Sequence, residues 1–152
     1  MNTKQIIQSQ YLAALAMFEQ VIVKCPETIW NTPGDKDKFW EKAYHTLFYV
    51  HLYLQDKEDD FVPWEKQHEE EEETPYRKDE ILEYLALVRV MVRERVPLID
   101  LEVDSGFYWL PFSKLELQFY NIRHIQQHTG ELYERLGTRE NIELDWVGTG
   151  PA

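Results

Sequence analysis

The sequence is poor in several features, and each shortage narrows what the protein can be. Its 152 residues include one cysteine, Cys25, so no disulfide can form within the chain, which suits a reducing compartment. Lys and Arg number 16 against 28 Asp and Glu, and the net charge is −12. Proteins bind nucleic-acid phosphates mainly through Lys and Arg. We therefore expect no nucleic-acid partner.

Long apolar runs are also lacking. No uninterrupted stretch approaches the roughly 18 apolar residues that a membrane span requires. The amino-terminal MNTKQIIQSQ has no apolar segment of the signal-peptide kind. We expect a cytoplasmic protein with no membrane partner. Cys25 directly precedes Pro26 at an expected helix end, and we interpret it as an ordinary packed or exposed residue; a nucleophilic thiol is the alternative.

What is present indicates a folded chain. Hydrophobic residues make up 43% and aromatic residues 14% of the composition, which argues against disorder. The length fits one domain, residues 1–152, with a core of its own.

The first half of the chain predicts two helices. Apolar residues recur every three or four positions over about Thr3–Lys24, which is typical of an amphipathic helix ending before Pro26. The NTPGD segment at Asn31–Asp35 predicts a turn. A second helix is expected over about Asp37–Gln55. Its apolar residues cover almost the whole circumference, as in a central buried helix.

The second half predicts two more helices. Thr74-Pro75 favours an N-cap and a first helical residue, and the third helix is expected to continue to about Val96. The fourth is expected over Ser113–Leu136, from a Ser113-x-x-Glu116 capping box to a stop at Gly137.

Two long connections separate these helices. The first, Asp56–Thr74, contains His68 and the acidic run Glu69–Glu73, which we interpret as a solvated segment, with a cation site as the alternative. The second, Leu98–Phe112, includes an exposed-looking FYWLP, and a short tail carries Trp146. Together these features predict an all-α four-helix bundle. The connections fit antiparallel neighbours and leave a crossover open.

Histidines supply the candidate site. His124 and His128 are four residues apart on the fourth helix, so both rings project from one face and can bind one metal ion. His45 on the second helix is expected to face the core and to supply the third ligand. His51 lies about 120° around the helix from His45 and is excluded, and His68 belongs to the solvated run. The alternative is that these histidines are structural residues held by hydrogen bonds.

Three neutral imidazoles on a divalent ion leave one position for water or substrate. Asn121, Glu131 and Tyr49 lie within a turn of a ligand and are candidates for supporting the ligands or transferring protons. Each has a structural alternative. Glu131 can pair with Arg135, Asn121 can bond locally, and Tyr49 can pack.

Two segments and the tail carry a family resemblance. AYHTLFYVHLYL on the second helix, NIRHIQQHTGELYERLG on the fourth and DWVG near the end resemble the DinB-like (DinB/YfiT) superfamily of metal-binding four-helix bundles. The resemblance implies that His45, His124 and His128 hold nickel or zinc and that the chain forms a homodimer. Members with known activities include thiol-dependent transferases and an isomerase.

The chemistry of a three-histidine site and the resemblance together predict a metal-dependent enzyme, a transferase or hydrolase-like protein acting on a small electrophile. A low-molecular-weight thiol as cosubstrate is what the resemblance implies. The alternative is a non-catalytic, stress-linked bundle in which the metal is structural. A second apolar face of the fourth helix independently favours a homodimer, with coverage by the loops or the tail as the alternative; its residues are Leu115, Phe119, Ile122 and Tyr133.

Overall fold

The computed structural model describes residues 1–69 and 74–151, and within these ranges the regular elements are helical. Residues Glu70–Glu73, most of the acidic run expected to be solvated, lie outside the described residues. The elements are α1 (Thr3–Lys24), α2 (Glu27–Trp30), α3 (Phe39–Tyr53), the 3₁₀ helix η1 (Glu58–Asp60), α4 (Lys78–Arg95), the 3₁₀ helix η2 (Val96–Leu98) and α5 (Lys114–Glu140). The all-α prediction is confirmed.

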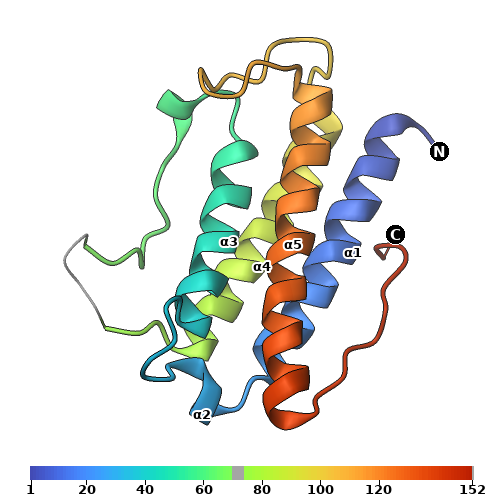
Figure 1. Cartoon of the computed structure of the whole chain (residues 1–152). Coiled ribbons are helices and arrows are strands. Elements are labelled where there is room, and N and C mark those ends of the chain that lie inside the picture. Colours follow the sequence, from blue (N-terminus) through green and yellow to red (C-terminus); the bar gives the residue numbers. More distant parts are fainter. Residues whose placement is uncertain (70–73, 152) are drawn as a thin grey trace.

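Four long helices lie side by side (Figure 1), and their buried apolar side chains form the larger of two hydrophobic clusters among the described residues. Both α1 and α3 pack against α4 and α5. Figure 1 shows that α3 and α4 run in the same direction and that α1 and α5 run in the opposite one. The connection after α3 therefore returns along the length of the molecule before α4 begins. It is a crossover, which explains why it is long.

The core combines aliphatic and aromatic side chains from all four long helices. Its largest fully enclosed members are Tyr11, Tyr76, Tyr84, Phe18 and Phe39. Cys25, at the end of α1, is also buried, and burial raises the pKa of its thiol to about 12. A thiol with so high a pKa is protonated at neutral pH, which fits a packed residue.

Within the described residues, α1 is long and apolar enough to cross a membrane by length and composition alone. The expectation that no segment could span a membrane considered only uninterrupted apolar runs, and α1 does not meet it when average hydropathy is used. Core helices of soluble proteins pass the hydropathy test as well, and 56% of the relevant window of α1 is buried inside the structure.

Several helix ends differ from the predicted ones. α4 begins at Lys78 after the N-cap Arg77, so the Thr74-Pro75 prediction is wrong. α5 continues through Gly137 to Glu140 and ends at Asn141, whose left-handed φ of 54° closes the helix. Gly137 therefore lies inside the helix instead of ending it. Asn141 can end the helix because Asn, like Gly, tolerates the left-handed conformation found at many helix ends. The Ser113 cap is confirmed, since its hydroxyl accepts a hydrogen bond from the Glu116 N–H.

The carboxy-terminal tail lies along α1 (Figure 1). Hydrogen bonds fasten it at intervals: Lys24 donates to the Glu143 carbonyl, and the Gly150 N–H donates to Ser9. The second apolar face predicted on α5 is mostly covered, because Leu115, Ile122 and Tyr133 pack against the core. Phe119 is the exception, at 63% exposed.

Candidate metal centre

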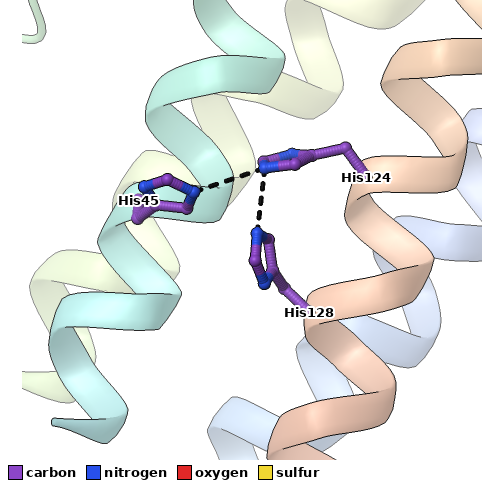
Figure 2. Close-up of side chains that lie close together, drawn as sticks. All are labelled: His45, His124 and His128. Atoms are coloured by element: carbon purple, nitrogen blue, oxygen red, sulfur yellow. Dashed lines mark hydrogen bonds between the residues drawn. The ribbon is translucent and has the colours of Figure 1, made fainter. Parts of the chain in front are cut away.

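Three histidine rings converge between α3 and α5 (Figure 2). His124 and His128 project from successive turns of α5, and His45 faces them from α3. The Nε2 atom of His124 lies 3.3 Å from Nε2 of His45 and 2.9 Å from Nε2 of His128. The predicted triad is therefore assembled in the fold, with one possible ligand atom from each ring within 4.8 Å of the others.

The protonation of His128 follows from Glu131. Nδ1 of His128 lies 3.0 Å from the Glu131 carboxylate. Partial burial opposes ionisation of that carboxylate, but hydrogen bonds from Lys42, His128 and Gln127 hold the pKa of Glu131 at about 2. An ionised carboxylate can only accept, so Nδ1 of His128 carries the proton. In the form that binds metals, Nε2 of His128 then presents its lone pair to the other two rings.

Hydrogen bonds alone leave this arrangement incomplete. If Nε2 of His124 carries a proton, it donates to His128 and has no lone pair for His45. If it carries a lone pair instead, it can accept from His45 but faces the lone pair of His128. A divalent cation would accept all three lone pairs together.

The spacing of the nitrogens agrees with that use. With metal–nitrogen bonds of about 2.05 Å, two ligands at a tetrahedral angle lie about 3.3 Å apart and two at a right angle about 2.9 Å apart. The two separations in the structure, 3.3 and 2.9 Å, match these values. The three residues could therefore hold a metal ion.

The charges of the site also favour neutral ligands. Burial, followed by the neighbouring His128 and His45, lowers the pKa of His124 to about 4. Burial, followed by His128 and Lys42, also lowers the pKa of His45. Both rings are therefore neutral near pH 7, the form in which imidazole binds a metal.

Lys42 is a site residue that the sequence reasoning missed. It lies one turn before His45 on α3 and donates to the Glu131 carboxylate of α5, with Asp37 at 3.8 Å. Lys42 is three residues before His45, so the two lie on nearly the same face of the helix. This spacing is the sequence feature that could have identified Lys42 as a neighbour of the site. The partner on α5 could be known only from the packing of the two helices.

The three supporting candidates have different positions. Glu131 contacts His128 directly, and Arg135, its alternative partner, pairs instead with Asp35. The Tyr49 ring lies 4.8 Å from the His45 ring and 5.7 Å from the His124 ring, so Tyr49 borders the triad.

Asn121 is fully buried on the core side of α5, where its amide donates to the Val50 carbonyl at 3.4 Å. No described contact joins it to a histidine of the triad, and its hydrogen bond crosses to α3 instead of staying with neighbours in the sequence, so the structure shows neither the supporting contact nor the local bond.

His45 is exposed, contrary to the expectation that it faces the core. The triad lies at the surface, beside a cavity of about 340 Å³ lined by Asp37, Glu41, Lys42, His45 and His128. The prediction was wrong because it assumed that α3 is buried on all sides. In the structure the groove between α3 and α5 opens to solvent. An ion held by the triad would thus be reachable from outside.

The other two histidines lie elsewhere. His51 is buried on another face of α3, which confirms that it cannot join His45. His68 stacks on Tyr76 with ring centroids 3.7 Å apart, so it is packed rather than part of a solvated run.

Comparison of the chain with family models, with curated proteins and with solved structures found no match. The site therefore has to be interpreted from its own geometry.

Proposed function

We propose that the protein binds one divalent metal ion, nickel or zinc, through His45, His124 and His128, and that it is a member of the DinB-like superfamily. The observation that carries the metal proposal is that one ligand nitrogen from each of the three rings lies within 4.8 Å of the others, with two Nε2 separations that match ligands of a single ion. The family assignment depends on the sequence resemblance alone.

Within this proposal the protein is a metal-dependent enzyme, a transferase or hydrolase for a small electrophile. A divalent ion held by three imidazoles lowers the pKa of a bound water or thiol and so supplies a nucleophile near neutral pH. The cavity beside His45 and His128 gives such a molecule access. The thiol cosubstrate is part of the proposal through the family resemblance.

The surrounding residues have positional roles in the proposal. Glu131 fixes the ring of His128 and its protonation, as carboxylates do behind metal-binding histidines. Lys42 holds Glu131 from the opposite helix. Tyr49 packs beside His45 and His124 and limits the rotation of both rings.

A second function has one observation in its favour. The ligands come from two helices, His45 from α3 and the other two from α5, so an ion would tie those helices together. A non-catalytic, stress-linked bundle with a structural metal would use the ion in this way. The exposure of His45 favours the first function, because a purely structural ion needs no open approach.

The homodimer remains part of the proposal. The exposed Phe119 is the one residue of the second apolar face on α5 that is left open for a partner. A monomeric mass in light scattering at micromolar concentration would contradict it.

The deciding experiment is metal analysis of protein purified without a histidine tag. We expect close to one nickel or zinc ion per chain, and loss of that ion in His124→Ala. The matched control is Arg123→Ala, because Arg123 is the adjacent exposed residue and its guanidinium lies over the Tyr120 ring, away from the triad nitrogens. Absence of bound metal together with no uptake of added nickel or zinc would overturn the proposal.

A thermal-shift screen separates the two functions. Bacillithiol, mycothiol, glutathione and coenzyme A are added to the metal-loaded protein and to His124→Ala. A thiol-dependent enzyme is expected to be stabilised by one of them in the metal-loaded form alone. Metal binding without any response to thiols or added small ligands would favour the structural metal.

A further inference from the structure

A second cavity lies on another side of α3, between the end of that helix, the connection after it and α4. Its volume is about 500 Å³, within the range of small-molecule sites. It shares no lining residue with the cavity at the histidine triad. The residues that line it are His51, Gln55, Asp60, Val62, Pro63, Trp64, Glu65, Glu83, Leu87, Met91 and Arg95.

His51 is the buried polar group of this cavity. The residue is 3% exposed, and its Nδ1 lies 2.8 Å from the Tyr84 hydroxyl. Its other ring nitrogen, Nε2, has no hydrogen-bond partner among the described residues. Nε2 is also not among the completely buried polar atoms that lack a partner, so part of its surface is accessible. Because His51 lines the cavity, Nε2 is the ring nitrogen that a bound molecule can reach.

The neighbouring hydroxyl decides what Nε2 offers. The Tyr84 hydroxyl has His51 as its one hydrogen-bond partner among the described residues, so its proton is satisfied only by donation to Nδ1. Burial, followed by the charge of Arg95, lowers the pKa of His51 to about 4, and the ring is neutral near pH 7. A neutral ring that accepts at Nδ1 carries its proton on Nε2. The cavity is thus lined by an N–H donor that has no acceptor among the described residues.

Arg95 supplies a cation beside this donor. One of its nitrogens donates to the side-chain oxygen Oε1 of Gln55 at 2.5 Å, and the side-chain nitrogen Nε2 of Gln55 donates to the His51 backbone carbonyl at 2.9 Å. Arg95 forms no ion pair with a described residue, so its remaining N–H groups and its charge are available. Guanidinium groups pair preferentially with carboxylates.

The rest of the cavity is apolar with an acidic rim. Trp64 stacks on Tyr84 with ring centroids 4.5 Å apart and nearly parallel planes, which fixes an aromatic wall. Leu87 and Met91 of α4 line the same cavity. Glu83, at the rim, is paired with Lys66, whereas Asp60 and Glu65 add negative charge. These carboxylates would repel a multiply charged phosphate more strongly than a monoanion.

We propose that this cavity binds a small monocarboxylate with an apolar body. The carboxylate accepts hydrogen bonds from Arg95 and from the Nε2–H of His51, and the apolar body packs against Trp64, Leu87 and Met91. Binding here does not depend on the metal at the triad, because the two cavities share no residue.

The test compares three probes of one shape: phenylacetate, the neutral phenylacetamide and the cationic phenethylamine. Binding is followed by chemical-shift changes of backbone amides in a two-dimensional NMR titration up to millimolar concentration. We expect saturable shifts with phenylacetate, concentrated around His51, Trp64 and Arg95, and much weaker effects from the other two. Octanoate and indole-3-acetate extend the series to longer and larger apolar bodies.

Variants assign the contacts. Arg95→Gln should weaken phenylacetate binding about tenfold or more, because it removes a charge-assisted hydrogen bond. The matched control Arg93→Gln alters an exposed arginine of the same helix that does not line the cavity, and it should leave binding unchanged. His51→Phe, which keeps a flat ring without a donor, should also weaken binding.

His124→Ala separates this site from the metal centre, since it should leave phenylacetate binding intact. Three outcomes would overturn the proposal: no saturable shift with any of the three carboxylates, equal binding of phenylacetamide or phenethylamine, or shifts confined to the surroundings of His45.

Discussion

The Glu131 carboxylate accepts a hydrogen bond from Nδ1 of His128 at 3.0 Å, across one turn of α5. Lys42 of α3 donates to the same carboxylate oxygen. The three side chains form a line from one helix to the other, directly behind the convergent histidine nitrogens. Glu131 therefore determines which nitrogen of His128 is free to bind a metal.

We predict that Glu131→Gln weakens metal binding about 10–100-fold, the usual effect of losing a hydrogen-bond partner behind a histidine ligand. The amide has no negative charge, so it attracts the His128 proton and Lys42 less strongly. A competition titration of nickel or zinc against a chelator measures the change. Glu134→Gln, an exposed neighbour on α5 that does not contact the triad, is the control, and equal affinities for wild type and Glu131→Gln would contradict the assigned role.

We predict that His51 makes the metal-free protein less stable in acid. Its pKa is about 4 in the folded chain, and that of an unfolded histidine is about 6.5, so between these values the unfolded state binds more protons. The contribution of His51 is complete above about pH 6.5 and falls as the pH falls toward 4, by at most about 3 kcal/mol.

Urea unfolding at pH 7 and pH 5, in the presence of a chelator, measures this dependence. His51→Gln is expected to be less stable at pH 7, because it loses the bond to Tyr84, but to lose less stability between pH 7 and pH 5 than the wild type. His45 and His124 are retained in both proteins, so their contributions cancel. An identical pH dependence in the two proteins would count against the prediction.

We predict that Gly106→Ala costs about 3 kcal/mol or more in free energy of unfolding. Gly106 has a φ of +92°, and a Cβ there would lie 1.9 Å from the Asp56 carbonyl oxygen. That oxygen already accepts a hydrogen bond from the buried Lys114, so it cannot retreat without breaking the bond. The substitution should detach the connection before α5 from the end of α3.

Gly34→Ala is the control for backbone conformation alone. Gly34 has nearly the same φ, +91°, but open space where a Cβ would be. It should cost only the left-handed strain of about 1–2 kcal/mol. Urea unfolding of both variants tests the comparison, and equal losses would show that the contact with Asp56 does not matter.

The helices could be predicted because their signals are local. The apolar spacing of residues 3–24 and the Ser113 cap depend on neighbours within one or two turns, and both appear in the structure as expected. Errors arose where two local signals competed. Gly137 and Asn141 can both end a helix, and in the structure α5 continues to the second. Arg77 precedes α4 although Thr74-Pro75 has the more common capping sequence.

The triad itself was predictable. The spacing of His124 and His128 is a property of one helix, and His45 was the remaining histidine whose position suited a third ligand, after His51 and His68 were excluded. The surroundings of the triad were not predictable. Whether His45 faces solvent or core depends on the angle at which α3 meets its neighbours, and sequence periodicity does not define that angle. For the same reason the contact of Lys42 with Glu131 and that of Asn121 with Val50 were overlooked, since both cross from α5 to α3.

The sequence by itself determined that this chain is helical, which residues form its apolar stripes and which three histidines are able to share an ion, because these are consequences of a repeat of 3.6 residues. Only the tertiary structure decided that the triad opens to solvent, that Lys42 and Glu131 support it, and that His51 lies in a separate cavity. These features depend on contacts between segments distant in the chain, and such contacts arise only when the crossover after α3 and the packing of the helices bring those segments together.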